Sequence, residues 1–180
     1  MHKYKTFVEI LESADREKAV FSAFFKGIKE DVSYGTFLDT IRSYPEIKGK
    51  TFAFLGDNSF SSILLLFILA YQKKTIVLLN PLEDEKLRKE KLNSLPFDGR
   101  VKGNQRIPYP NPKENDNKEA YFYFYTSGTT SSSKAVVLTE ENLCASSYNG
   151  SYCLPLTEQD RFLSLLPLFH VFGFVCALLW

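Results

Sequence analysis

The sequence predicts an α/β fold in which mostly parallel sheet layers are flanked by helices. Two short, continuously apolar runs, Thr51–Leu55 and Thr75–Leu79, enclose an apolar helix from about Ser59 to Gln72. This spacing is typical of a βαβ unit, and strands without polar alternation are typical of a parallel sheet covered on both faces. Strand-like runs return at Tyr121–Tyr125 and Ala135–Leu138, which extends the same architecture along the chain.

Two helices are expected before this unit. Apolar residues recur near one face at helical spacing from about Phe7 to Phe25. A second helix is expected from near Tyr34 to just before Pro45, because the residue preceding a proline disfavours helical backbone. The apolar face of the first helix comprises Ile10, Leu11, Ala14, Phe21, Phe24 and Phe25.

The remaining elements follow the βαβ unit. A charged run over 83–92 predicts a helix with a solvated face, and the stretch 103–119, with three prolines at alternate positions, predicts a loop or linker. Beyond the later strands we expect a helix from Glu140 to about Ser147 and a strand over Phe162–Leu166. The segment after Pro167 is expected to turn and enter a helix.

Composition excludes several classes of function. The chain has 180 residues, 44% of them hydrophobic, and a formal net charge of +1, so it lacks the general electrostatic attraction that nucleic acids or anionic membranes require. Its three cysteines, Cys144, Cys153 and Cys176, show no CxxC spacing and no histidine close by in the sequence, which argues against a zinc site and a disulfide scaffold. We therefore expect a cytoplasmic protein without a metal site of its own.

Two apolar stretches raise the question of a membrane span. The run over 63–70 is too short to cross a bilayer. Phe162–Trp180 contains no formally charged residue. However, Pro167, His170 and Gly173 fall in its middle, where an isolated bilayer helix would lose hydrogen bonds. We expect no membrane contact, with a C-terminal anchor as the alternative interpretation.

The most informative segment lies between the two later strands. It is built only of Thr, Ser and Gly over 126–133 and is followed by Lys134. Small residues allow backbone N–H groups to turn toward one point, hydroxyls donate further hydrogen bonds, and a lysine supplies a mobile positive charge, which together suit a polyphosphate. A flexible Ser/Thr linker is the alternative, although such linkers are seldom placed directly between two apolar strands.

A P-loop is a second alternative for this segment, and the residues disagree with it. The position of the second glycine holds Ser133, and the position of the magnesium-binding hydroxyl holds Ala135. The element that follows is also strand-like, whereas a P-loop opens a helix.

The run YTSGTTSSSKAVVLT over 125–139 resembles the phosphate-loop motif T-S-G-T-T-G-x-P-K-G-V of the adenylate-forming superfamily, which includes acyl-CoA synthetases, aryl-CoA ligases, luciferases and peptide-synthetase adenylation domains. Other stretches are similar in order and spacing. They are YGTFLDTIRSYP at 34–45, the βαβ unit with its Asn80-Pro81 exit, LTEENL at 138–143 and LPLFHVFGF at 166–174.

The resemblance implies roles for particular residues. Thr126, Ser127, Gly128, Thr129, Thr130 and Lys134 would hold the β- and γ-phosphates of ATP, supplied with Mg²⁺. His170 would border the acyl pocket; on the sequence alone, a buried histidine satisfied by a backbone carbonyl is the alternative. The implied activity is ATP-dependent, AMP-forming activation of a small-molecule carboxylate followed by transfer to coenzyme A.

The resemblance also implies that residues 1–180 are the front part of the N-terminal, AMP-binding domain of a longer enzyme, because the later motifs of the family do not occur in the chain. We expect this part to be inactive alone and to self-associate through an exposed C-terminal apolar face. Ser131, Ser133 and Ala135 replace Gly, Pro and Gly of the motif. These replacements support the alternative of a degenerate, non-catalytic α/β interaction module that binds no nucleotide.

Overall fold

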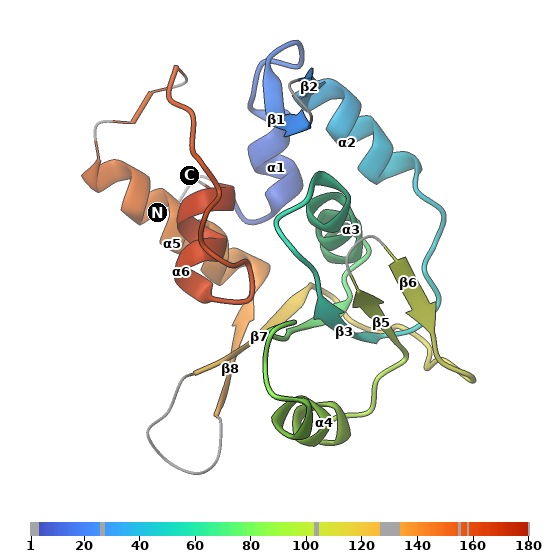
Figure 1. Cartoon of the computed structure of the whole chain (residues 1–180). Helices are drawn as coiled ribbons and strands as arrows, with labels where there is room; N and C mark the ends of the chain where they lie inside the picture. The colour runs from blue at the N-terminus through green and yellow to red at the C-terminus, as the bar shows by residue number, and fades with distance from the viewer. Residues whose placement is uncertain are drawn as a thin grey trace.

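The computed structural model describes residues 4–25, 28–102, 105–126, 134–154, 156–157 and 159–179. Its centre is a mixed six-stranded sheet with the order β6-β5-β3-β4-β7-β8 (Figure 1). The strands are β3 Thr51–Leu55, β4 Thr75–Leu78, β5 Gly99–Lys102, β6 Gln105–Pro108, β7 Tyr121–Tyr125 and β8 Ala135–Thr139.

The prediction of a mostly parallel sheet is confirmed. β3 pairs in parallel with β4 and β5, and β4 pairs in parallel with β7, whereas the edge strands β6 and β8 pair antiparallel with their neighbours. Along β3 the side chains alternate between the two faces, so Phe52 and Phe54 enter one core while Ala53 enters another.

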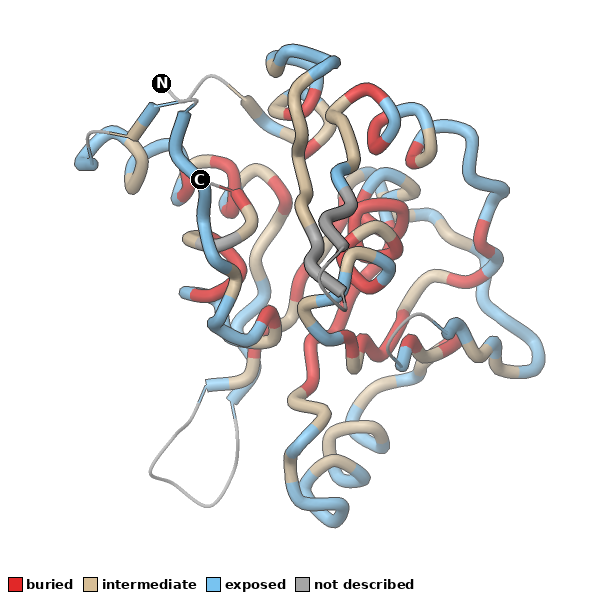
Figure 2. Tube along the Cα trace, turned by 45° about the horizontal axis from the view of Figure 1, so that its top comes forward, coloured by how far each residue is buried: buried red, intermediate tan, exposed pale blue. Residues whose placement is uncertain are grey.

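Helices cover both faces of the sheet. The larger layer lies above it in Figure 1, and one helix, α4 Glu85–Asn93, lies below. Figure 2 shows the buried residues gathered between the sheet and the larger layer. That layer contains α1 Phe7–Glu12, α2 Tyr34–Ser43, α3 Phe60–Tyr71, α5 Glu140–Cys153 and α6 Val171–Phe174, the last continuing into a π-helical turn, η1 Val175–Leu179.

An aromatic cluster joins elements that are far apart in the sequence. The Phe7 ring of α1 lies 5.2 Å from Phe67 of α3, 5.5 Å from Phe122 of β7 and 6.0 Å from Phe174 of α6, measured between ring centroids. All four side chains are nearly or fully buried. Each buried aromatic ring contributes roughly 2–3 kcal/mol of hydrophobic stabilisation, so this cluster fixes the helical layer onto β7.

The predicted helix over Phe7–Phe25 is wrong beyond its first third. α1 ends at Glu12, and β1 Ala19–Phe25 forms an antiparallel pair with β2 Ile28–Ser33. The stretch contains both helical spacing and a β-prone aromatic run, and the pairing with β2 decides between them. The second predicted helix is confirmed as α2, which begins after the capping Ser33 and ends two residues before Pro45.

Three further expectations need correction. The predicted linker 103–119 includes β6, which pairs with β5, so only its later part runs as a loop. Phe162–Leu166 forms no strand, because no neighbouring strand pairs with it, and most of its side chains are exposed. Finally, α5 continues past Ser147 to Cys153.

The later part of the linker is anchored at the amino ends of the strands. Asp98, just before β5, accepts backbone hydrogen bonds from Lys50 at 2.9 Å, Thr51 at 2.9 Å and Lys113 at 2.7 Å. These bonds hold the pKa of the Asp98 carboxyl below its usual value even though burial opposes them. Within the described ranges, no helix is long and apolar enough to span a bilayer.

Candidate functional site

The β7–β8 hairpin brings two of the predicted phosphate-binding residues together. The backbone N–H of Thr126 donates a hydrogen bond of 2.9 Å to the carbonyl of Lys134, and the Thr126 hydroxyl donates one of 3.3 Å to the same oxygen. These bonds continue the antiparallel ladder by one step beyond the Tyr125–Ala135 pair. Ser127, Gly128, Thr129 and Thr130 lie outside the described residues, as do 131–133.

The hairpin opens at the edge of the sheet where ligands bind in open α/β folds. β3, β4 and β7 are parallel, so their carboxyl ends meet at one edge. Residues 55–58 follow β3 and Asn80 follows β4 at that edge, and α3 and α4 leave from there to opposite faces of the sheet. In open α/β sheets, ligands usually bind outside the carboxyl ends of the strands, where neighbouring connections leave to opposite faces. The Thr126–Lys134 pair lies at this edge.

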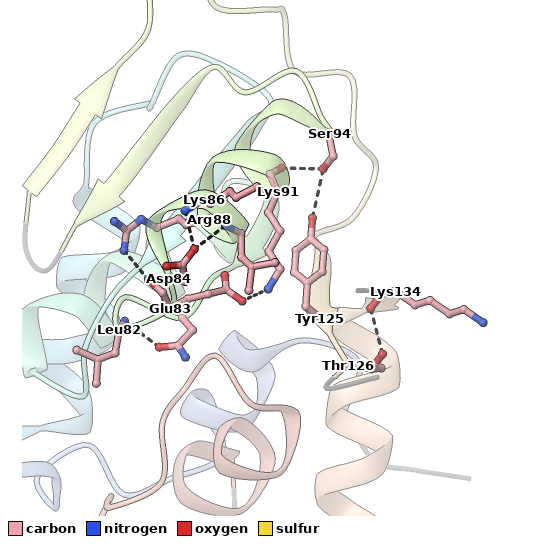
Figure 3. A network of polar contacts seen from close by, with 12 residues as sticks. Leu82, Glu83, Asp84, Lys86, Arg88, Lys91, Ser94, Tyr125, Thr126 and Lys134 are labelled. Atoms are coloured by element: carbon pink, nitrogen blue, oxygen red, sulfur yellow. Dashed lines mark hydrogen bonds and ion pairs between the residues drawn. The ribbon is translucent and has the colours of Figure 1, made fainter. Parts of the chain in front are cut away.

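The Lys134 side chain is free to reach a ligand. The residue is exposed, and Figure 3 shows its ammonium pointing away from the other labelled side chains. Only its backbone carbonyl takes part in closing the hairpin. A mobile ammonium of this kind acts as a point charge for phosphate oxygens.

The base of the hairpin also contacts α4 on the opposite face of the sheet. Lys91 Nζ lies 4.6 Å from the centre of the Tyr125 ring, and the Tyr125 hydroxyl lies 3.4 Å from Ser94 Oγ (Figure 3). Lys91 also forms an ion pair with Glu83. Sequence reasoning treated 83–92 as a solvated face and missed these contacts. Glu83 and Lys91 are eight residues apart, so helical spacing gave no signal for this pair.

His170 lies on another element and caps α6. Its Nδ1 accepts a hydrogen bond of 3.3 Å from the backbone N–H of Phe172, and the residue is exposed. The alternative of a buried histidine satisfied by a carbonyl is therefore wrong, because the imidazole is exposed and accepts from a free N–H at a helix start instead. The structure gives no direct contact between His170 and the described part of the hairpin.

A side-chain amide ties the segment before His170 to the sheet. Asn58 Nδ2 donates to the carbonyls of Ser164 and Leu166, each at 2.9 Å, and lies 3.2 Å from the Ser164 hydroxyl. Asn58 comes shortly after the carboxyl end of β3. The segment that carries His170 and the β7–β8 hairpin are thus both attached at the same edge of the sheet.

Cysteines and acidic groups do not assemble a metal centre in the part of the chain that the structure describes. Cys144 is buried in α5, and its burial raises the pKa of the thiol to about 12, which keeps it protonated and unreactive.

Comparison with known proteins points to one family. A family model described as AMP-binding enzyme matches residues 52–180. An oxalate–CoA ligase from Arabidopsis thaliana is 50% identical over 54 residues, covering 30% of this chain and 10% of the relative. A 2-succinylbenzoate–CoA ligase from Bacillus cereus is 45% identical over 56 residues, covering 31% of this chain and 12% of the relative.

Solved structures share the fold. The o-succinylbenzoate CoA synthetase MenE from Bacillus subtilis, in complex with an acyl-adenylate intermediate, superposes with a TM-score of 0.64 at 22% identity, over 81% of this chain and 46% of that one. A long-chain-fatty-acid–CoA ligase from Archaeoglobus fulgidus gives a TM-score of 0.66 at 17% identity, over 97% and 45%. The chain thus spans less than half the length of both solved proteins. With the family model covering most of its residues, the chain belongs to the AMP-binding enzyme family.

Proposed function

We propose that the chain is part of an ATP-dependent, AMP-forming carboxylate–CoA ligase. Residues 1–180 would form the front part of its N-terminal, AMP-binding domain. The support is the family match, the CoA ligases among the relatives, and the difference in length between this chain and those relatives. Solved structures of the MenE enzyme from Bacillus subtilis, which share the fold, hold AMP in one complex and ATP with a magnesium ion in another.

The observation that carries the proposal is the closure of the β7–β8 hairpin by Thr126 and Lys134 at the carboxyl edge of the parallel strands. Thr126, Ser127, Gly128, Thr129, Thr130 and Lys134 would hold the β- and γ-phosphates of ATP. In the complete enzyme, a carboxylate oxygen would attack the α-phosphorus and pyrophosphate would leave. The thiol of coenzyme A would then take the acyl group and release AMP. The hairpin's contribution would be to position and neutralise the phosphate chain.

His170 would border the acyl pocket of that enzyme. Support comes from its exposed imidazole, and from the attachment of its segment to Asn58 at the same sheet edge as the hairpin. The part of the chain described here would be inactive alone, and the working environment of the enzyme would be the cytoplasm.

A non-catalytic module remains the second candidate, and a specific observation favours it. Ser131, Ser133 and Ala135 replace residues that make the family's loop permissive and stiff. A serine in the left-handed region costs about 1 kcal/mol or more relative to glycine, so phosphate binding would be weakened or abolished where the loop needs that conformation.

The test is calorimetric titration of the chain with Mg-ATP. Replacing Lys134 by Ala removes a charged contact to phosphate, which we expect to weaken binding by about 10- to 100-fold. Lys118→Ala is the matched control, because Lys118 is exposed just before β7, at the opposite edge of the sheet. Equal affinity in the Lys134→Ala and Lys118→Ala variants would contradict the phosphate role of Lys134. An absence of binding to the unaltered chain would favour the non-catalytic module.

Self-association is part of the same proposal. Exposed apolar side chains gather before and within α6, and a second copy of the chain would cover them. They are Phe162, Leu163, Leu165, Leu166, Val171 and Phe172. Sedimentation velocity at increasing concentration should show a growing dimer fraction, which Leu163→Ser combined with Phe172→Ser should abolish.

A further inference from the structure

The last residue of β7 is held by the end of α4. Tyr125 directly precedes Thr126, and its ring faces the ammonium of Lys91, with 4.6 Å between Nζ and the ring centre. Its hydroxyl lies 3.4 Å from Ser94 Oγ, and Ser94 is the C-cap of α4. Lys91 and Ser94, both at the end of α4, therefore contact the side chain of the residue just before Thr126 (Figure 3).

Lys91 is itself fixed by Glu83, which lies just before α4. The two side chains form an ion pair and are only 11% and 15% exposed. The second carboxylate oxygen of Glu83 is buried without a hydrogen-bond partner among the described residues. The pair is thus largely shielded from water. A cation over an aromatic face interacts most strongly when it is shielded in this way.

The same helix contains a contrasting pair. Lys89 and Glu85 form an ion pair of 2.8 Å on the outer face, where their side chains are 68% and 69% exposed. Exposed pairs of this kind contribute little to structure. Replacing Lys89 therefore serves as the control for replacing Lys91, because only the Lys91 pair is buried against Tyr125.

Attachment of α4 to the sheet does not depend on Lys91. Leu92 and Leu95 pack against the small core formed by Ala53, Val77 and Leu79. This apolar contact docks the helix on the sheet, whereas Lys91 acts at one place, the end of β7. Removing its charge should loosen that strand end without releasing the helix.

We propose that Glu83 and Lys91 are positioning residues for the base of the β7–β8 hairpin, acting through the Tyr125 ring on the Thr126–Lys134 closure. The consequence for nucleotide binding rests on the function proposed above, while the positioning itself rests on the described contacts. Without Lys91, the Glu83 carboxylate would be left buried and unpaired, and both Glu83 and Tyr125 would shift toward solvent. The hairpin base would then open more often.

The direct readout is hydrogen exchange of the Thr126 amide, which donates to the Lys134 carbonyl. In Lys91→Met we expect this exchange to be about tenfold faster than in the unaltered chain, because a partly desolvated cation–π contact and its ion pair are lost. Lys89→Met, with the same change on the outer face, should leave it unchanged. Lys91→Arg keeps a cation over the ring and should restore slow exchange, which a loss of bulk packing alone would not predict.

A second route covers the case in which Lys91→Met folds poorly. Tyr125→Leu keeps an apolar side chain at the strand end but removes the ring face, and it should speed Thr126 exchange to a similar extent. The double variant Lys91→Met with Tyr125→Leu should then add little to either single change. Full additivity of the two changes, or equal Thr126 exchange in Lys91→Met and Lys89→Met, would overturn the proposal.

Nucleotide titration separates this inference from the proposed function. Lys134→Ala should weaken Mg-ATP binding without changing Thr126 exchange, whereas Lys91→Met should change both. If Lys91→Met speeds exchange yet binds Mg-ATP as tightly as the unaltered chain, the claim of positioning for phosphate is wrong. If no variant binds nucleotide, the proposed function fails, while the exchange data still decide whether Glu83 and Lys91 position the hairpin.

Discussion

The carboxylate of Glu140 accepts a hydrogen bond of 2.7 Å from the backbone N–H of Phe7, 133 residues earlier in the chain. Glu140 is the first residue of α5 and Phe7 the first residue of α1, so a carboxylate at the start of one helix satisfies a free backbone N–H at the start of another. Burial raises the pKa of Glu140 to about 7, although the hydrogen bond from Phe7 opposes the rise. Nearby Glu9 and Glu119 raise this pKa further.

This carboxylate should make stability fall as pH rises toward neutrality. The pKa of Glu140 is about 7 in the folded chain against 4.5 for an ordinary glutamate, so the folded state binds the proton more tightly. The stabilisation from the protonated carboxyl is complete below about pH 4.5 and falls between pH 4.5 and 7. Above that window the free energy of unfolding is lower by about 3 kcal/mol. Glu140→Gln keeps an oxygen for the Phe7 N–H and removes the titration. It should therefore be the more stable protein at pH 8 and lose its advantage at pH 5.

Urea unfolding from pH 5 to 8.5 measures this difference. Glu141→Gln is the matched control, because Glu141 follows Glu140 in α5 but its side chain is 42% exposed and pairs with Lys5 at 3.6 Å. Its stability curve should run parallel to that of the unaltered chain. A Glu140→Gln curve that is also parallel across the range would show that Glu140 is ionised in the folded protein at all these pH values.

Local sequence patterns were sufficient for the centre of this fold. β3, α3 and β4 are each mostly apolar and contain no charged residue, so their type and order are readable from the sequence. The stretch from Phe7 to Phe25 was misread because its last part, Ala19–Phe25, combines helical spacing with a β-prone aromatic run. Its pairing with 28–33 is a contact between separate segments, which periodicity within one segment does not report.

The candidate site was readable only in part for the same reason. The Thr126–Lys134 end of the hairpin follows from a motif between two strands, and the structure places both residues together. The Lys91–Tyr125 contact joins residues whose separation in the sequence carries no period. Lys91 and its solvated neighbour Lys89 are both lysines of the same helix that pair with a glutamate. Only the packing of α4 on the sheet, which buries Lys91, distinguishes them.

Asn58 should control the order of the segment before His170. Asn58→Ala removes the donor shared by the Ser164 and Leu166 carbonyls, and leaving such acceptors unpaired costs about 1–3 kcal/mol. We expect faster chymotryptic cleavage at Phe162–Leu166 and a lower melting temperature. Asn93→Ala is the control, because Asn93 is exposed at the end of α4. Equal cleavage rates in the two variants would mean that the amide does not hold the segment.

Two glycines should respond in opposite directions to the same substitution. A Cβ added at Gly173 would lie 2.5 Å from the Pro167 carbonyl oxygen, a backbone atom that cannot turn aside. Gly173→Ala should therefore destabilise the chain by about 1–3 kcal/mol, as overpacking does, and displace the turn that carries His170. Gly150 lies inside α5, where alanine improves helix propensity, so Gly150→Ala should stabilise by about 0.5–1 kcal/mol. Thermal unfolding of both variants measures the two signs, and a stabilising Gly173→Ala would show that α6 does not pack this closely against Pro167.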